Sequence, residues 1–422
     1  MKRRRLTTLL ASIVCLTGLL AGCRENEAPP FPKDKKAALT IAYTNESAFF
    51  KRYDNLFNLE YPNLRLTITS TIPLVSKKIS VENWVKQNKF DIIYLPPDIL
   101  KEMADRNDLQ PLDLWIQRDS FPLDDYIPQV VDYVRSIGSG KLYGLPPSFY
   151  GQAIAYNKDL FDAYHIKYPH EGMTWEDLLR LAGRFPAKDE HGNALIGLAT
   201  HAPSSFEFML KVGFGQGLTM MQGNPPSAAV ASDSWKQIWK LTLPLLQGGQ
   251  LMNNSDSNTY MDAFHAGQQA MAVVNYEEYK PLAGKKELSF QWSLAPFPTH
   301  PAQPDNNDTL QIDGLYAVSA QSADKEAAWE LVKFLNSRTV AKWDYRSLFG
   351  FSTLQSEVST NQEERERLSA MYALRQTYRP VERVPSELIG KANTAIQGIL
   401  DGSHTLEEAL DQLQRDSQQL IK

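Results

Sequence analysis

The sequence predicts an α/β protein built as two lobes. Three stretches, residues 39–43, 64–68 and 90–95, alternate in polarity or are apolar enough to be buried on both faces, which is typical of β-strands. They recur about every 26 residues, and residues 49–59 between the first two have a helical pattern, so successive β-α-β units and a parallel sheet are expected. About 400 residues follow the N-terminal segment, which favours two lobes over one.

The first 22 residues are expected to be a secretory signal peptide. A basic head, Lys2 to Arg5, precedes an apolar run over residues 6–20, which is shorter than the roughly 20 residues that span a membrane. The run ends in Leu-Ala-Gly before Cys23, and this resembles a bacterial lipobox, in which the chain is cut before a lipidated cysteine. Cys23 is therefore the predicted lipidation site and membrane anchor. The alternative is an ordinary signal peptide followed by a cysteine by chance.

Charge and cysteine content narrow the class of protein. The formal net charge is -5, and loss of the four basic residues of the head makes it -9. A nucleic-acid partner is not expected, because such proteins usually carry a basic surface. Both cysteines, Cys15 and Cys23, lie in the N-terminal segment, so the domain has no intramolecular disulfide and depends on its own core.

The rest of the chain carries recognisable boundaries. Residues 23–36 are charged, hold three prolines and lack an apolar period, which predicts a disordered tether. Capping boxes at Thr174 and Thr405 predict helix starts, and residues 322–335 predict an amphipathic helix. Further strands are predicted at residues 152–156, 270–275 and 315–319.

The sequence shows no motif for catalysis, for a metal or for a cofactor. Residues 138–141 resemble a phosphate loop but lack its first glycine and its final Ser or Thr, so they predict a surface turn. Asp256 and Asp305 begin stretches that resemble calcium loops without the glycine and the closing glutamate. The seven histidines are scattered. No catalytic residue, metal ligand or cofactor is therefore predicted.

Several segments, in order over nearly the whole chain, resemble the bacterial extracellular solute-binding proteins of family 1, the sugar-binding group that includes the maltodextrin receptor. The segments are residues 90–98 (FDIIYLPPD), 140–146 (GKLYGLP), 155–161 (AYNKDLF), 173–178 (MTWEDL), 264–271 (FHAGQQAM), 313–319 (DGLYAVS), 327–334 (AAWELVKF) and 402 with 408–410.

The resemblance implies a periplasmic-binding-protein-like fold, with two α/β lobes joined by a three-segment hinge around a central ligand cleft. Closure about such a hinge is a two-state equilibrium that ligand contacts bias. Lobe 1 is expected to comprise residues 37–145 and 314–348. Lobe 2 is expected to comprise residues 146–305 and 349–422, with 306–313 as a hinge crossover.

The resemblance also implies where ligand contacts lie. Sugar capture uses carboxylates and amides that bind hydroxyls, and aromatic faces that cover apolar ring edges. The candidate ligand-binding residues are Asn45, Glu46, Asp98, Ser148, Phe149, Tyr150, Ser205, Phe206, Asn275, Tyr276 and Asp313. Tyr276 or Tyr279 would replace a tryptophan common in maltodextrin-type relatives, and Asp313 stands where relatives tend to have glycine. The alternatives are that the aromatic residues belong to the core and that Asn45, Glu46 and Asp98 are helix caps or first-turn residues.

The resemblance implies an extracytoplasmic protein that is not an enzyme. It is expected to be a monomer, held to the cell membrane by its lipid, that captures a mono- or oligosaccharide and delivers it to the permease subunits of an ABC transporter. Two alternatives stay open: a receptor for a peptide or sugar acid that reports to a membrane sensor kinase, and an enzyme on this fold.

Overall fold

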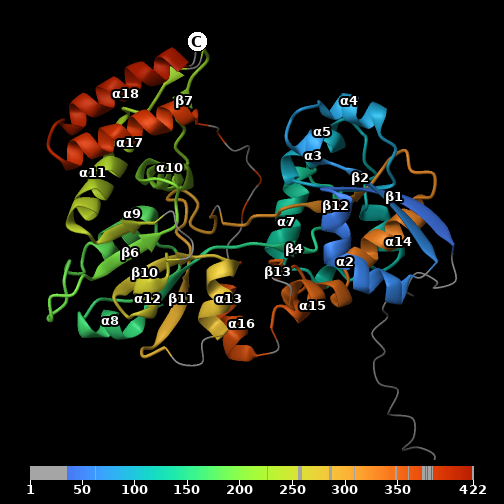
Figure 1. The fold of residues 1–422 in the computed structure, drawn as a ribbon, viewed down its shortest axis with the longest axis horizontal. Coiled ribbons are helices and arrows are strands. Elements are labelled where there is room, and N and C mark those ends of the chain that lie inside the picture. Colours follow the sequence, from blue (N-terminus) through green and yellow to red (C-terminus); the bar gives the residue numbers. More distant parts are fainter. Residues whose placement is uncertain are drawn as a thin grey trace, which may run out of the picture.

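A computed structural model describes residues 36–420 apart from 62, 226, 255–258, 285–287, 308, 347–348, 360, 373–375, 377, 379–381 and 383. The predicted signal peptide, Cys23 and all but the last residue of the predicted tether lie outside these residues. Within them, no helix combines the length and the apolar character needed to cross a membrane. Figure 1 shows two α/β lobes side by side, so the predicted fold class is confirmed.

The first lobe is built on a four-stranded mixed sheet with strand order β12-β3-β1-β2. Strand β1 runs parallel to both β2 and β3, whereas β12 pairs with β3 in the antiparallel sense. The strands are β1 (Ala37–Tyr43), β2 (Leu64–Ser70), β3 (Ile92–Leu95) and β12 (Leu315–Val318). The sheet is therefore completed by a strand that arrives much later in the chain.

Helices on this first sheet come from two separate parts of the chain. They are α2 (Glu46–Glu60), α3 (Ile72–Val75), α4 (Val81–Gln87), α5 (Pro97–Asp105), α6 (Asp113–Arg118), the 3-10 turn η1 (Leu123–Asp125), α7 (Pro128–Ile137), α14 (Lys325–Leu335) and α15 (Arg338–Arg346). Helix α14 packs on β12 and β1, and α15 follows it toward the junction of the lobes.

The second lobe is built on a five-stranded sheet with strand order β11-β5-β10-β6-β9. Strands β6, β9 and β10 are parallel, and β5 is antiparallel to both of its neighbours. The strands are β5 (Ala153–Asn157), β6 (Ile196–Thr200), β9 (Leu251–Asn253), β10 (Gln269–Val274) and β11 (Trp292–Pro296), and a small hairpin adds β7 (Met221–Gln222) and β8 (Ser227–Ala228).

Two helices of the second lobe begin at the capping boxes that the sequence predicts. The Thr174 side chain accepts from the Asp177 backbone in a complete capping box, and Thr405 and Glu408 form the same arrangement. The helices are α8 (Lys158–Ala163), α9 (Trp175–Ala182), α10 (Ser205–Gly215), α11 (Asp233–Gly248), α12 (Asp262–His265), α13 (Tyr276–Gly284), α16 (Gln362–Ser369), α17 (Ser386–Leu400) and α18 (Leu406–Leu420).

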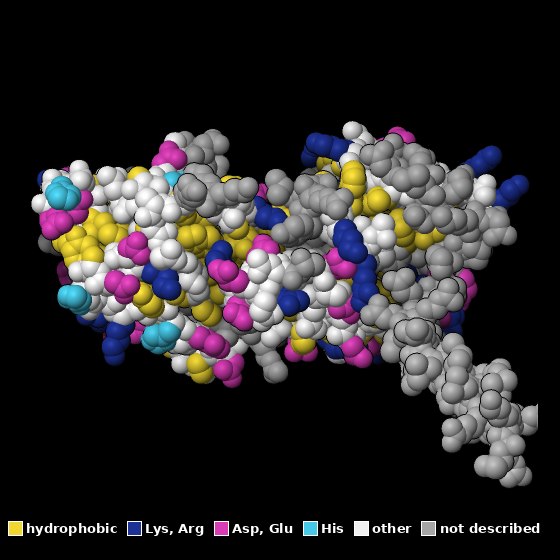
Figure 2. Space-filling model, turned by 90° about the horizontal axis from the view of Figure 1, so that it is seen from below, with side chains coloured by type: hydrophobic (Ala, Val, Ile, Leu, Met, Phe, Trp, Pro, Cys, Tyr) yellow, Lys and Arg dark blue, Asp and Glu magenta, His cyan; other side chains and the backbone are white. Residues whose placement is uncertain are grey.

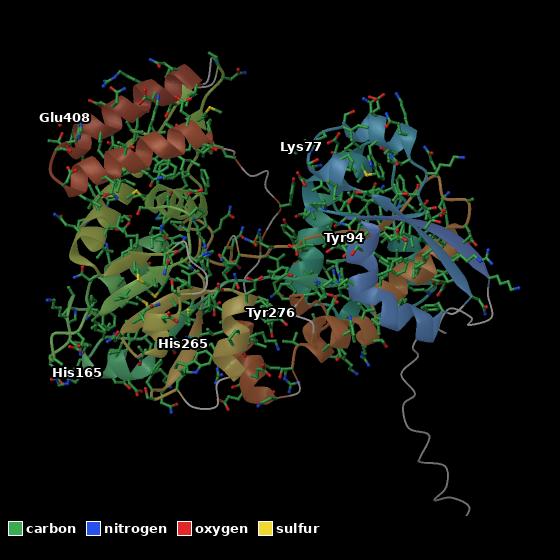
Figure 3. The ribbon with its side chains drawn as sticks, in the orientation of Figure 1. Lys77, Tyr94, His165, His265, Tyr276 and Glu408 are labelled. Atoms are coloured by element: carbon green, nitrogen blue, oxygen red, sulfur yellow. The ribbon has the colours of Figure 1, made fainter. Side chains whose placement is uncertain are left out.

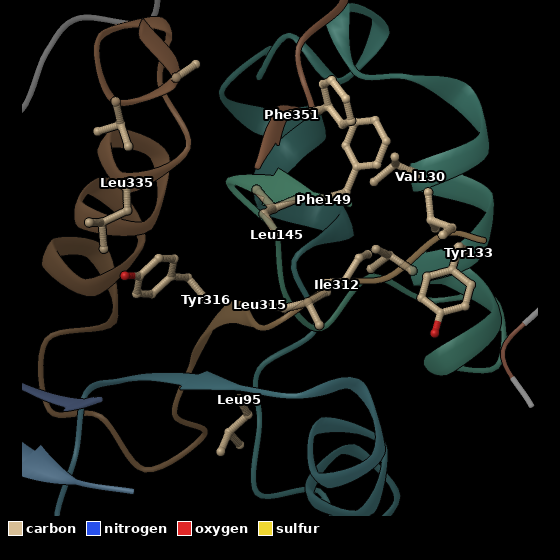
Figure 4. Packing of buried hydrophobic residues seen from close by; sticks show 14 of the residues in the cluster. Leu95, Val130, Tyr133, Leu145, Phe149, Ile312, Leu315, Tyr316, Leu335 and Phe351 are labelled. Atoms are coloured by element: carbon tan, nitrogen blue, oxygen red, sulfur yellow. The ribbon is translucent and has the colours of Figure 1, made fainter. Parts of the chain in front are cut away.

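The chain passes between the lobes in three neighbouring segments. The first holds β4 (Ser148–Phe149), which pairs with β13 (Phe351–Ser352) of the third, just before the 3-10 turn η2 (Gln355–Glu357). The second is joined to the first by an isolated bridge between Tyr150 and Gln311. Figure 4 shows that Phe149 and Phe351 pack against each other at this junction, above Ile312 and Leu315. The three segments thus form one connected hinge.

Two apolar clusters hold the molecule together. One fills the first lobe and continues through Phe149 and Phe351 to one face of the second sheet, while the other covers the opposite face of that sheet. Strand β5 shows the division clearly, because Ala153 and Ala155 belong to the first cluster and Ile154 belongs to the second. The hinge is therefore part of a continuous core.

The stretch between α16 and α17 contacts both lobes. The Tyr378 backbone amide donates to the Ser136 hydroxyl of α7 at 2.9 Å, and the Met220 amide donates to the Glu382 carboxylate at 3.0 Å. The chain thus returns to the first lobe before its last two helices pack on the second.

Candidate ligand-binding site

The carboxyl ends of both sheets face the hinge. Strand β12 begins where the second crossover enters the first lobe, and its Leu315 pairs with Leu95 at the end of β3. Strand β5 begins just after the first crossover, and its Ala153 pairs with Val274 at the end of β10. Ligands of open α/β sheets bind outside the carboxyl ends of the strands. The region between these two edges is therefore the candidate site, and Figure 2 shows, from below, the two halves of the molecule that lie on either side of it.

Tyr150 and Asp313 form a polar pair at the hinge. Tyr150 exchanges two backbone hydrogen bonds of 2.8 Å with Gln311, and its phenol lies close enough to the Asp313 carboxylate for the two groups to affect each other's pKa. Burial raises the pKa of both groups, and the nearby charge of Glu277, at the start of α13, adds to this effect. The Tyr150 ring also meets Tyr276 edge to face at 6.3 Å. Of the predicted residues, these are the ones that the structure brings together.

Tyr94 extends this polar surface on the first lobe. Its ring lies 5.1 Å from the Tyr43 ring and 4.7 Å from the Tyr316 ring, measured between centroids. Burial raises the pKa of its phenol, which the Arg52 guanidinium opposes. A β-carbon on Gly314 would lie 2.5 Å from the Tyr94 ring, so the ring rests directly on the backbone next to Asp313. Figure 3 shows Tyr94 on the first lobe and Tyr276 on the second, either side of the hinge region.

Arg52 of α2 lies behind these residues and is only 5% exposed. Its Nε donates to Asp344 Oδ1 at 3.0 Å, and its Nη2 also pairs with the second oxygen of that carboxylate. Nη2 reaches the Ser148 hydroxyl at 3.4 Å, and the guanidinium lies 4.6 Å from the centre of the Phe349 ring. The sequence analysis missed Arg52, because an arginine within a helix usually faces solvent and nothing local predicts its distant partner.

A second polar group lies at the carboxyl edge of the second sheet. Glu278 caps α13 by accepting from the Asn275 amide at 2.9 Å, and burial raises the pKa of its carboxyl group. Burial lowers the pKa of the Lys211 amino group to about 8, partly offset by the charge of Glu278. His201, directly after β6, lies close enough to Glu278 to oppose the rise in the pKa of that carboxyl group. This group supplies a lysine, a histidine and a carboxylate close to the candidate site.

The three predicted polar residues of the first lobe all lie at helix starts. Asn45 caps α2 by accepting from the Ala48 amide at 2.8 Å, and Glu46 is in the first turn of that helix. Asp98 is in the first turn of α5, where Lys77 lies 4.0 Å away. These residues act as caps or first-turn acids, and they also lie at the carboxyl edge of the first sheet, so a ligand contact remains a proposal.

Several predicted residues are buried. Phe149 and Tyr276 have no exposed surface, Ser148 is turned toward Arg52, and Phe206 packs 6.0 Å from Trp239 within the second lobe. The aromatic members are therefore core residues in this conformation, as the alternative interpretation holds. Ser205 and Asn275 are half-buried at the starts of α10 and α13, where Asn275 accepts from the Glu277 amide at 2.6 Å.

The arrangement is suited to binding. Phenols and carboxylates from both lobes can exchange hydrogen bonds with hydroxyl groups, and tyrosine rings can cover apolar edges. Among the described residues, no group of three or more His, Cys, Asp or Glu side chains is placed to hold a metal ion.

Comparison with known families gives the same picture. The model of the family described as bacterial extracellular solute-binding protein matches residues 60–360 of this chain. The chain belongs to this family. The location of this solute-binding protein is accordingly extracytoplasmic, and the predicted family and fold are confirmed.

Solved structures share the fold of this solute-binding protein at low sequence identity. An extracellular solute-binding protein of family 1 from Alicyclobacillus acidocaldarius is 13% identical, with a TM-score of 0.67 over 94% of this chain and 100% of its own. The substrate-binding protein Lmo0181 of Listeria monocytogenes, in complex with cycloalternan, is 18% identical, with a TM-score of 0.56 over 92% and 99%. A solute-binding protein of Agrobacterium vitis with bound D-mannitol is 17% identical, with a TM-score of 0.58 over 91% and 98%.

Proposed function

We propose that this protein is a lipid-anchored receptor that captures a mono- or oligosaccharide outside the cytoplasm and delivers it to the permease subunits of an ABC transporter. It acts as a monomer and does no chemistry on the ligand. The anchor is Cys23, beyond the described residues.

The observation that carries this proposal is the Tyr150–Asp313 pair between the carboxyl edges of the two sheets. The Asp313 carboxylate can accept from one sugar hydroxyl while the Tyr150 phenol donates to the next, and Tyr94 offers a further phenol beside Gly314. Solute-binding proteins of this fold with bound cycloalternan and D-mannitol support a hydroxyl-rich ligand.

A thermal-shift screen of the mature chain tests the ligand class. The panel contains maltose, maltotriose, cycloalternan and D-mannitol, with a peptide mixture and glucuronate as the competing classes. A ligand that binds only the folded state raises the Tm by mass action. A carbohydrate or polyol should raise it; a shift with peptides or glucuronate alone contradicts the sugar proposal.

Two variants connect any positive ligand to this site. Tyr150→Phe keeps the ring and removes the hydroxyl, and Asp313→Asn removes the charge. Because a hydrogen bond to a charged group contributes about 1.5–3 kcal/mol, each variant should weaken binding roughly 10- to 100-fold in calorimetry. The control is Asp105→Asn at the exposed end of α5, where Asp105 pairs with Lys101 on the surface. Unchanged affinity in both site variants would place the ligand elsewhere.

A further inference from the structure

Arg52 contacts two segments of the hinge and acts electrostatically on the third. It donates to Ser148 in the first crossover, and it stacks near Phe349, which precedes β13 in the third. Its charge also acts on Asp313 in the second crossover. The guanidinium of one helix of the first lobe therefore contacts two of the segments that join the lobes and acts electrostatically on the other.

Asp344 gives this arginine a fixed position. The carboxylate binds both Nε and Nη2, and the two side chains are 5% and 3% exposed. Such a two-point contact fixes the plane of the guanidinium as well as its place. The backbone is tied in as well, because Trp343 Nε1 donates to the Arg52 carbonyl at 2.6 Å. Helices α2 and α15 are thus joined beside β4 and β13 (Figure 1).

Stability alone does not account for this pair. Removing two charges from water costs about as much as their attraction returns, so a buried ion pair often adds little to the free energy of unfolding compared with apolar residues of the same size. What a buried pair with fixed geometry can supply is a defined arrangement of the segments that it joins.

We propose that Arg52 is a positioning residue of the hinge, which with Asp344 holds the crossovers against α2 and so sets the relative orientation of the two lobes. The Tyr94 ring and the Tyr150–Asp313 pair are placed by the same segments. Loss of this pair would let the lobes sample a wider range of orientations without unfolding either one.

Distances between spin labels on the two lobes test this proposal without any ligand. Both cysteines of the chain lie in the first 23 residues, so Cys15→Ser and Cys23→Ser give a cysteine-free background. Labels are attached at Asn83→Cys on α4 and Lys240→Cys on α11, both exposed. Pulsed dipolar spectroscopy then gives the distribution of inter-lobe distances.

The test variant is Arg52→Met with Asp344→Leu, which removes both charges and leaves no unpaired ion. The expected result is a shift or broadening of the distance distribution with circular dichroism unchanged. Arg52→Lys keeps the charge but not the two-point contact, and it should show the same change in milder form.

A second ion pair of the first lobe provides the matched control. Lys333 and Asp119 are 3.0 Å apart and mostly buried, and within the described part of the chain neither charge contacts a hinge segment. Lys333→Met with Asp119→Leu should alter the Tm but not the distances. Distributions that match wild type in both Arg52 variants would overturn the proposal, as would an equal change in the control. If the double variant does not fold, the Arg52→Lys distances decide. None of these outcomes depends on which solute the protein binds.

Discussion

The amino group of Lys211 lies 5.1 Å from the centre of the Phe297 ring, directly beyond the end of β11. The ring and the surrounding protein replace water around this lysine, and the pKa of Lys211 is lowered to about 8 as a result. Burial therefore destabilises the protonated form of Lys211, which lies at the carboxyl edge of the second sheet beside the candidate site.

This lysine should make stability depend on pH. Between pH 8 and about 10, the unfolded chain binds the Lys211 proton and the folded chain releases it, so the free energy of unfolding rises with pH. The gain attributable to Lys211 is on the order of 1–3 kcal/mol, since one pKa unit corresponds to about 1.4 kcal/mol. Urea denaturation of wild type and Lys211→Met between pH 7 and 9.5 measures it, with Lys240→Met on exposed α11 as the control. Parallel pH profiles of wild type and Lys211→Met would contradict the prediction.

Two helical glycines should respond in opposite ways to alanine. A β-carbon on Gly213 of α10 would overlap the Trp235 ring, whereas one on Gly390 of α17 meets nothing within 4 Å. Gly213→Ala should destabilise by about 1–3 kcal/mol through overpacking. Gly390→Ala should stabilise by up to about 1 kcal/mol, because alanine favours the helix. Chemical denaturation measures both, and a neutral Gly213→Ala would show that the ring can move aside.

Phe206 should matter for folding and not for ligand binding. Its ring packs with Trp239 and is 2% exposed. Phe206→Ala is expected to cost about 3–5 kcal/mol of unfolding free energy. Affinity of the folded variant for a ligand found in the screen should equal that of wild type in calorimetry. A tenfold loss of affinity would return Phe206 to the ligand site.

Gly314→Ala, unlike Phe206→Ala, should weaken ligand binding. The added methyl group would collide with the Tyr94 ring and displace its phenol from Asp313 and Arg52. Binding is expected to weaken by roughly tenfold or more, which corresponds to the loss of about one hydrogen bond. Calorimetry and Tm measured together separate this effect from instability. Tyr94→Phe, which keeps the ring, provides the comparison for the hydroxyl alone.

Cys23 should determine membrane attachment. Cys23→Ser removes the thiol that takes the lipid, and a chain without an acyl anchor is expected in the soluble fraction after cell fractionation. Cys15→Ser, within the apolar run, is the control and should stay with the membrane. Labelled palmitate should enter the control and not Cys23→Ser. Retention of Cys23→Ser on the membrane would argue against a lipid anchor.

Most of the fold could be predicted from local sequence patterns. The capping boxes at Thr174 and Thr405 begin helices within one residue of the predicted positions, and strands such as β1 and β10 agree with the predicted ranges to within two residues. These signals are local, because a cap bonds to the backbone amides of its own helix and an apolar run of residues predicts that the same strand is buried.

The candidate site could be predicted less well, because the residues that interact there are far apart in the sequence. Arg52 and Asp344 are 292 residues apart, and nothing near either one indicates burial. Tyr94 was expected in a strand buried on both faces, although it is partly exposed and its ring lies against Gly314. Phe206 and Tyr276 show the converse problem, since both were predicted to contact a ligand and both are buried. The local sequence around an aromatic residue is the same whether its ring packs in the core or faces a ligand.

The late arrival of β12 has a consequence for how the chain matures. Some 220 residues separate the end of β3 from the start of β12, and the whole second sheet lies between them. While the polypeptide emerges, β3 keeps an unpaired edge that is open to mispairing with other chains. The sheet of the first lobe cannot be completed until most of the second lobe has been synthesised. Pairing of strands so distant in sequence makes folding slow. The nascent solute-binding protein must therefore be protected from aggregation before its ligand site can form.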